Sequence, residues 1–276
     1  MKIKTPLSCG RGVGVRAMKK IIFTYHYIIH QFKSTNKGAV RSPFVSDLLT
    51  NVIDVKTKYY PFKKIETLRE QLLDSKKIIH SIDLGAGDKK EATKKVSQIA
   101  KHAAKSAKHA QLLFRLANYF QPEQAIELGT SLGISTAYLA SANSKTQLIT
   151  MEGCPETAAI AQQNFQHLKL KNIQQIIGNF DETLPKVLSR ISKIDLVFFD
   201  GNHRKEATLN YFKQCLEKAN ESTVFIFDDI YWSQEMMQAW TDIKNNERVT
   251  LTIDLFFMGI VFFRKEQAKQ HFLIRF

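Results

Sequence analysis

The chain has 276 residues, of which 44% are hydrophobic and 11% aromatic. This composition excludes a disordered or fibrous protein and is sufficient for one large domain or a domain with an appendage. The three cysteines form no CxxC pair, which argues against a disulfide framework and a structural zinc site. No apolar run approaches the ~18 to 20 residues of a membrane span. We therefore expect a soluble protein of the cytoplasm.

The net charge of +14 is concentrated in the first part of the chain. Residues 1–118 contain 24 Lys and Arg against 8 Asp and Glu, a net charge of +16, whereas residues 119–276 contain 16 against 18, a net charge of −2. A basic segment favours an anionic partner such as nucleic acid, a lipid surface or a phosphorylated substrate. A solvated, lysine-rich surface would have the same composition, so charge alone leaves both interpretations open.

The first 17 residues are predicted to form a loose tail. They combine Pro6 with several glycines and have no apolar periodicity. Met18 opens a patterned segment, so it is a second candidate for the translation start, beside Met1.

Residues 18–107 are predicted to form a basic, mostly helical N-terminal extension. Aromatic and aliphatic residues alternate with basic ones, and Pro43 and Pro61 interrupt the pattern, which favours short helices. Over residues 96–120 apolar residues recur mostly at steps of three and four, which predicts one helix that ends before Pro122.

From residue 108 onward short apolar runs alternate with amphipathic stretches. The residues at or just past the carboxyl ends of five such runs are 25, 27, 21 and 28 positions apart, the length of one strand, one helix and two loops. This rhythm predicts a parallel, doubly wound sheet. The five predicted strands are 125–128, 147–151, 173–177, 194–199 and 224–227.

Two further apolar runs, 249–255 and 257–263, are joined too closely for a helical crossover, so we expect a final antiparallel pair. The predicted fold class is therefore α/β, with a doubly wound, mostly parallel, seven-stranded sheet.

Ligands bind beyond the carboxyl ends of the strands in open parallel sheets. The first such end reads Glu-Leu-Gly-Thr-Ser-Leu-Gly over 127–133. Its glycines allow a tight turn and a close approach to a ligand, and hydroxyls flank the next helix. Glu152 ends the second strand and can accept hydrogen bonds from both hydroxyls of a ribose. Loop and acid together predict a nucleoside site that includes Glu127, Gly129, Thr130, Ser131, Gly133, Ser135 and Glu152.

A competing glycine loop, Ser-Ile-Asp-Leu-Gly-Ala-Gly, lies at 81–87. Residues 92–122 contain no Asp or Glu, so no acid follows this loop at the distance that a ribose requires. We interpret residues 83–87 as a structural turn.

Several segments, taken in order, resemble the motifs of class I S-adenosylmethionine-dependent methyltransferases, especially the metal-dependent O-methyltransferases of the catechol type. The resemblance spans roughly residues 108–263 and implies a Rossmann-like methyltransferase domain over 108–276, with S-adenosylmethionine as cofactor. The segments that carry it are 127–136, 151–153, 178–180 with Leu184-Pro185, 195–200 and 227–230.

The resemblance implies a role for each matching position. The loop 129–133 would line the methionine part of the cofactor, and Glu152 would hold the ribose. Asn179 and Phe180 would edge the adenine, although an acid is common in the family at position 179. Asp200 would lie near the transferred methyl group.

In the metal-dependent branch Asp200, Asp228 and Asp229 would also bind a divalent cation, and three carboxylates suit Mg²⁺. The branch has an amide at the position of Asp229, and either Asp228 or Asp229 could instead cap the following helix. His203 stands where the branch has the base that removes the hydroxyl proton; the alternative is a solvated histidine in a polar loop.

The sequence thus predicts methyl transfer to an oxygen of a small molecule, an anionic one being an option, with help from a divalent metal. A homodimer is compatible with the sequence. Three alternatives stay open: an RNA methyltransferase that uses the basic extension, a non-catalytic nucleoside-binding module, and a nicotinamide-dependent oxidoreductase. A stripe that includes Trp232, Met236 and Trp240 is either core or a substrate wall.

Overall fold

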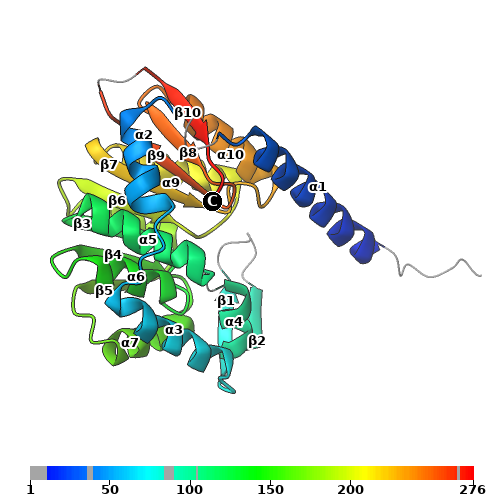
Figure 1. Ribbon diagram of the computed structural model, residues 1–276. Helices are drawn as coiled ribbons and strands as arrows, with labels where there is room; N and C mark the ends of the chain where they lie inside the picture. The colour runs from blue at the N-terminus through cyan, green and yellow to red at the C-terminus, as the bar shows by residue number, and fades with distance from the viewer. Residues whose placement is uncertain (1–10, 36–39, 84–89, 104, 266–267) are drawn as a thin grey trace, which may run out of the picture.

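The computed structural model describes residues 11–35, 40–83, 90–103, 105–265 and 268–276 (Figure 1). Over these residues an eight-stranded sheet has the order β10-β8-β9-β7-β6-β3-β4-β5. Its strands are β3 (Gln124–Leu128), β4 (Gln147–Glu152), β5 (Ile173–Ile177), β6 (Ile194–Phe199), β7 (Ala219–Asp228), β8 (Leu251–Asp254), β9 (Met258–Phe262) and β10 (Gln270–Leu273).

The pairing confirms the predicted α/β sheet. All neighbouring pairs within the group β3 to β7 are parallel. Strand β9 is antiparallel to both β7 and β8. The sheet has one strand more than the seven expected, because β10 joins the edge parallel to β8. This strand is half-exposed and polar at its start, so it lacks the apolar run by which the others were predicted.

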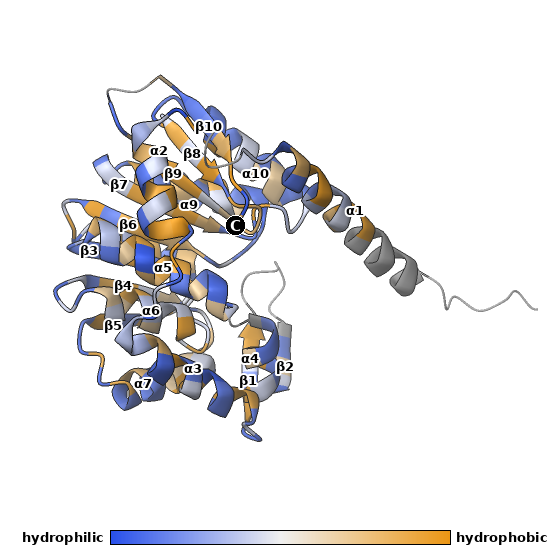
Figure 2. Cartoon of the chain, viewed as in Figure 1, coloured by the Kyte–Doolittle hydropathy of each residue, from blue (hydrophilic) through white to orange (hydrophobic). Residues whose placement is uncertain are grey.

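Two layers of helices cover the sheet because strand side chains alternate between its faces. In β7, Val224 and Ile226 belong to one core, and Phe225 and Phe227 to the other. The first core also contains α2 (Pro43–Leu48), the π-helix η2 (Leu49–Ile53), α5 (Ala107–Phe120) and α6 (Ile134–Ala142). The second contains α8 (Phe180–Leu188), α9 (Lys205–Leu216) and α10 (Gln234–Asn245). Figure 2 shows the strands between these layers as largely hydrophobic.

Helix α1 (Arg11–Lys33) extends away from the body of the molecule, and its last turns pack beside β8 and β9 (Figure 1). His30 is buried, and its Nε2 lies 3.0 Å from Oδ1 of Asp254. Asp254 is itself buried and also accepts hydrogen bonds from the Tyr231 hydroxyl and the Trp240 indole, both at 3.0 Å. This carboxylate therefore fixes α1 to the C-terminal part of the sheet.

The prediction of a loose tail over 1–17 is wrong from residue 11 onward, since α1 begins there. Gly12 and Gly14 each cost about 1 kcal/mol in a helix but do not forbid it, and no proline follows Pro6 in this stretch. Residues 1–10 lie outside the described part of the chain.

The N-terminal extension is less helical than predicted. It contains α3 (Tyr60–Leu73) and α4 (Val96–Ala103), but also an antiparallel hairpin of β1 (Ile78–Asp83) and β2 (Lys90–Lys95). Residues 84–89, which include most of the competing glycine loop, lie outside the described residues.

The single helix predicted over 96–120 is two helices. It divides into α4 and α5 because Ser106 caps α5: its hydroxyl accepts a hydrogen bond from the backbone N–H of His109. The stretch between the two helices contains Lys105. Among the described helices, none is both long and apolar enough to cross a membrane.

Candidate functional site

The loops after β3 to β7 surround one side of a cavity of about 700 Å³ at the carboxyl edge of the sheet. Most of the predicted site residues line it: Gly129, Thr130, Ser131, Ser135, Glu152, Asn179, Phe180, Asp200, His203 and Asp229. Three predicted residues, Glu127, Gly133 and Asp228, are not among the lining residues. The far wall comes from the N-terminal extension.

The glycine loop after β3 is shaped by contacts within the protein. Gly129 has a φ of +110°, and a Cβ there would lie 2.2 Å from the carbonyl oxygen of Asp200. Gly133 has a φ of +81°, and a Cβ there would lie 2.5 Å from the ring of Phe165. Glycine is required at both positions because β6 and α7 (Pro155–His167) approach the loop closely. Gly133 therefore shapes the loop from behind and does not face the cavity, contrary to prediction.

Glu152 is held at the end of β4 by backbone donors. Its Oε2 accepts a hydrogen bond of 2.8 Å from Ser131 N–H, and its Oε1 accepts one of 2.9 Å from Cys154 N–H. The carboxylate thus bridges the loops after β3 and β4 and lines the cavity. A carboxylate oxygen can accept more than one hydrogen bond, so this side chain is of the type that binds ligand hydroxyls.

Glu127 lies beneath the glycine loop rather than in the cavity wall. The residue is fully buried, and its Oε2 accepts hydrogen bonds from the hydroxyls of Thr150, at 2.7 Å, and Thr136. Its Oε1 has no hydrogen-bond partner among the described residues. Burial raises the pKa of Glu127 to about 7, so the carboxyl group holds its proton far more readily than an exposed glutamate.

Asn179 and Phe180 begin α8 beside the cavity. The Asn179 side chain caps this helix, since its Oδ1 accepts a hydrogen bond of 3.0 Å from Asp181 N–H. Asn and Asp cap helices about equally well, which accounts for an amide where the family commonly has an acid. The Phe180 ring packs edge-on against Tyr211, with centroids 6.0 Å apart, and both rings line the cavity.

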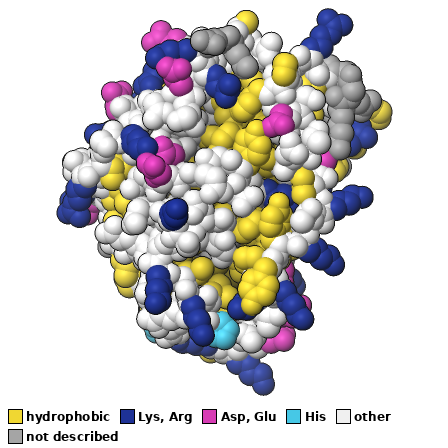
Figure 3. Space-filling view, turned by 60° about the vertical axis from the view of Figure 1, so that its left-hand side comes forward, with side chains coloured by type: hydrophobic (Ala, Val, Ile, Leu, Met, Phe, Trp, Pro, Cys, Tyr) yellow, Lys and Arg dark blue, Asp and Glu magenta, His cyan; other side chains and the backbone are white. Residues whose placement is uncertain are grey.

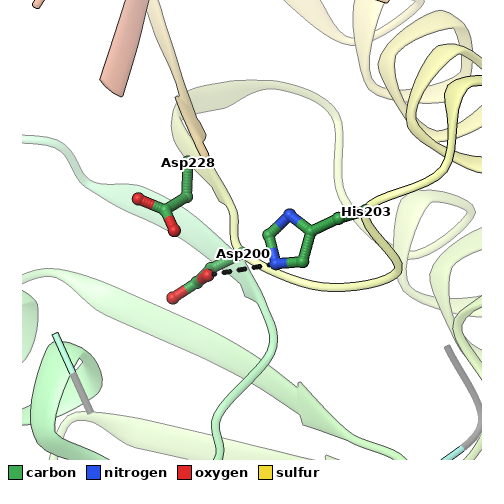
Figure 4. Close-up of side chains that lie close together, drawn as sticks. All are labelled: Asp200, His203 and Asp228. Carbon is green, nitrogen blue, oxygen red and sulfur yellow. Dashed lines mark ion pairs between the residues drawn. The ribbon is translucent and has the colours of Figure 1, made fainter. Parts of the chain in front are cut away.

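Asp200, His203 and Asp228 come together at the ends of β6 and β7 (Figure 4). One ligand atom from each lies within 4.8 Å of the others, and Nε2 of His203 is 3.7 Å from Oδ1 of Asp200. Burial raises the pKa of the Asp200 carboxyl, and the nearby Lys105 opposes this rise. Asp229 lines the cavity with a φ of +52° but lies outside this group. The predicted set of three aspartates is therefore only partly assembled, and His203 stands in the place of Asp229.

Lys105 is the main residue that the sequence analysis missed. Its Nζ contacts Oδ2 of Asp228 and lies 3.3 Å from Oδ1 of Asp200. Only 13% of the Lys105 side chain is exposed, and Asp228 is 2% exposed. Ser106, an N-cap type of residue in the middle of an apparent helix, was the one signal that a break occurs here, and no local pattern indicates that a lysine reaches the ends of β6 and β7.

The first residues of the competing glycine loop, 81–87, also contribute to the site, whereas most of the predicted structural turn, 83–87, lies outside the described residues. Ser81 and Ile82 of β1 line the cavity, and Ile82 N–H donates a hydrogen bond of 3.4 Å to Cys154 Sγ. Of the aromatic stripe, Trp240 and Met236 are buried in the core, whereas Trp232 is 64% exposed and lines the cavity. The stripe is thus mostly core, with one aromatic residue left at the cavity.

Part of the sequence that forms this site matches one protein family. Residues 126–230 match the model of a methyltransferase domain. The chain has the fold of class I methyltransferases.

The chain is similar to two bacterial proteins of known name and to solved structures. Catechol O-methyltransferases of Mycobacterium tuberculosis and Niastella koreensis are 30% and 31% identical over 129 and 128 residues, which cover 46% and 45% of this chain. The chain spans 57% of the length of each. An O-methyltransferase of Bacillus cereus, solved in complex with SAH, superposes with a TM-score of 0.54 at 19% identity, covering 79% of this chain and 95% of that one. The structural likeness supports the fold.

Proposed function

We propose that the protein transfers a methyl group from S-adenosylmethionine to an oxygen of a small molecule. One observation carries this proposal: a glycine loop and the carboxylate of Glu152 lie on one cavity together with the pair Asp200 and His203. The glycine loop and Glu152 suit the binding of a nucleoside, and Asp200 with His203 suits proton transfer from a hydroxyl. The names of the similar proteins, catechol O-methyltransferase and O-methyltransferase, agree with this assignment.

The residues of the cavity fit this cofactor. Glu152, oriented by two backbone N–H groups, would accept the ribose hydroxyls. The rings of Phe180 and Tyr211 offer an apolar surface for the adenine. Glu127, beneath the glycine loop and outside the cavity lining, would support the loop that faces the cofactor.

His203 would remove the proton from the acceptor hydroxyl. When bound, S-adenosylmethionine supplies an electrophilic methyl group on a sulfonium. Asp200, 3.7 Å from Nε2 of His203, would stabilise the protonated imidazole that results. Gly129, in close approach to the Asp200 carbonyl, would keep this acid beside the cofactor loop.

The methyl acceptor we propose is an aromatic alcohol or phenol, and an anionic one fits well. Trp232 contributes an exposed aromatic side chain to the cavity, and the lining also includes Lys94, His102 and Lys105. An aromatic ring can stack on the indole, and negative charge is attracted to the basic side. The magnesium site expected from the resemblance does not fit this arrangement, because the Lys105 ammonium already contacts the carboxylates of Asp200 and Asp228.

No observation favours an RNA substrate. On the face that Figure 3 shows, Lys and Arg side chains are distributed over the surface rather than gathered in one tract, and several lie near Asp or Glu. A strand of RNA is bound by a continuous basic groove with stacking aromatic residues. We therefore attribute the positive net charge largely to solvated surface.

Calorimetry with S-adenosylhomocysteine tests the proposal, with a nicotinamide dinucleotide as the competing ligand. We expect micromolar binding of the first and none of the second. Glu152→Ala should weaken binding at least ~30-fold, since two hydrogen bonds to a charged acceptor are lost. Glu217→Ala, an exposed position outside the cavity, is the matched control. Mass spectrometry of phenolic acceptors after incubation with S-adenosylmethionine should show a gain of one methyl group. Well-folded protein that binds the dinucleotide instead would refute the proposal.

A further inference from the structure

Lys105 occupies the centre of the acidic group at the ends of β6 and β7. Asp200 and Asp228 bring two carboxylates within 4.8 Å of each other, and both are largely buried. Two such charges repel each other strongly away from water unless a cation lies between them. The ammonium of Lys105 contacts both carboxylates: its Nζ lies 3.3 Å from Oδ1 of Asp200 and also contacts Oδ2 of Asp228.

The position of Lys105 is supported from its backbone. Its carbonyl oxygen accepts a hydrogen bond from the Arg69 guanidinium on α3. Arg69 forms an ion pair of 3.0 Å with Glu66, and Glu66 accepts a hydrogen bond of 2.7 Å from the hydroxyl of Tyr138 on α6. A connected series of polar contacts thus runs from the methyltransferase domain through α3 to the stretch before α5. The N-terminal extension thereby sets where the lysine enters the site.

This arrangement disfavours a resident divalent ion. Mg²⁺ would need oxygens of the same two carboxylates at about 2.0 to 2.1 Å. An ion so placed would lie within a few ångströms of the ammonium, where repulsion between the two positive charges is severe in a largely buried site. One cation excludes the other as long as Lys105 keeps its contacts.

We propose that Lys105 is the built-in cation of this site and takes the place of a divalent metal ion. The proposal rests on the proposed methyl transfer and adds to it the group that stabilises the negative charge on the acceptor oxygen. Lys105 lines the cavity beside Asp200 and His203, so an acceptor oxygen near the imidazole also lies near the ammonium.

In the transfer, the O–H proton moves to His203 as the acceptor oxygen bonds to the methyl carbon. The bond between that carbon and sulfur breaks, and its electron pair stays on sulfur, which becomes a neutral thioether. Lys105 takes no part in the proton transfer and acts only through its charge.

Metal binding, measured apart from turnover, tests this inference. Mn²⁺ is titrated into the full-length wild type, Lys105→Met and Lys101→Met and followed by electron paramagnetic resonance; Lys101 is an exposed lysine on α4 outside the cavity lining. We expect the wild type and Lys101→Met to bind Mn²⁺ equally weakly and Lys105→Met to bind it at least ~10-fold more tightly, because the two carboxylates become available. Equal binding by the wild type and Lys105→Met would overturn the inference.

Turnover supplies a second measurement. The wild type should keep its rate in EDTA, whereas Lys105→Met should lose at least ~100-fold and recover part of it with Mg²⁺ or Mn²⁺. A wild type that EDTA inactivates, and that Mg²⁺ restores, would refute the inference even if Lys105→Met does not fold. Calorimetry with S-adenosylhomocysteine on the same samples separates the two proposals. If the wild type and Lys105→Met bind Mn²⁺ equally while both still bind S-adenosylhomocysteine, the role of Lys105 is refuted. If S-adenosylhomocysteine does not bind at all, the methyl transfer is refuted.

Discussion

Replacing Glu127 by glutamine should change how stability depends on pH. Glu127 is fully buried, and burial raises its pKa from 4.5 to about 7 in the folded protein. The folded state therefore holds a proton that the unfolded state releases between these two pH values. The stability linked to this proton is fully present below pH 4.5 and is lost as the pH rises through 7.

The magnitude follows from the size of this rise. One pKa unit corresponds to about 1.4 kcal/mol, so ionising the buried carboxyl costs about 3 kcal/mol once the pH exceeds 7. Glutamine keeps the shape of the protonated side chain and carries no titratable group. Between pH 5 and pH 8 the free energy of unfolding of Glu127→Gln should rise by about 2 to 3 kcal/mol relative to the wild type.

Urea unfolding of both proteins at pH 5 and pH 8 measures this difference directly. Other titrating groups cancel because they are common to both. Glu123→Gln is the matched control: Lys193 lowers the pKa of the exposed Glu123, which therefore titrates below this window. If the stability difference between the wild type and Glu127→Gln is the same at both pH values, Glu127 is ionised at little cost and our account of its environment is wrong.

Three further substitutions probe the loop, the C-terminal network and the base. Gly129→Ala would place a Cβ 2.2 Å from the Asp200 carbonyl oxygen at a φ of +110°. It should weaken S-adenosylhomocysteine binding, measured by calorimetry, at least ~10-fold, and an unchanged affinity would contradict the packing argument. Asp254→Asn replaces the buried carboxylate that His30 contacts. It should lower the free energy of unfolding, measured in urea, by about 3 kcal/mol, and a loss under ~1 kcal/mol would refute the stabilising role of this network. His203→Gln should reduce kcat at least ~100-fold while nucleoside affinity changes less than ~2-fold; a retained kcat would exclude it as the base.

Matched controls separate these effects from general damage. Gly259→Ala places a Cβ 2.5 Å from the Trp240 ring, outside the cavity lining, so it should lower stability and leave nucleoside affinity unchanged. His167→Gln, at the exposed end of α7, should alter neither kcat nor affinity.

The central strands could be predicted from the sequence because their signal is local. A parallel strand buried on both faces needs a short, continuous apolar run, as in 194–199, which is β6 residue for residue. Polar residues just past such runs must lie at one edge of a parallel sheet, so the sequence alone could place Glu152 and Asp200 at that edge, where both line the cavity. Strand β10 was missed because a half-exposed edge strand carries no such run.

Only the tertiary structure decided what each of these residues contacts. Glycine at 129 suggested space for a ligand, but its missing Cβ makes room for the Asp200 carbonyl on a neighbouring strand. Glu127 and Glu152 look alike in the sequence, and burial is the main cause of the raised pKa of Glu127. Lys105 reaches Asp228 across 123 positions because α3 holds its backbone and the helix breaks at Ser106. Periodicity reports the neighbours of a residue along its own helix or strand, whereas the charge balance of a buried site depends on side chains that packing brings together from distant segments.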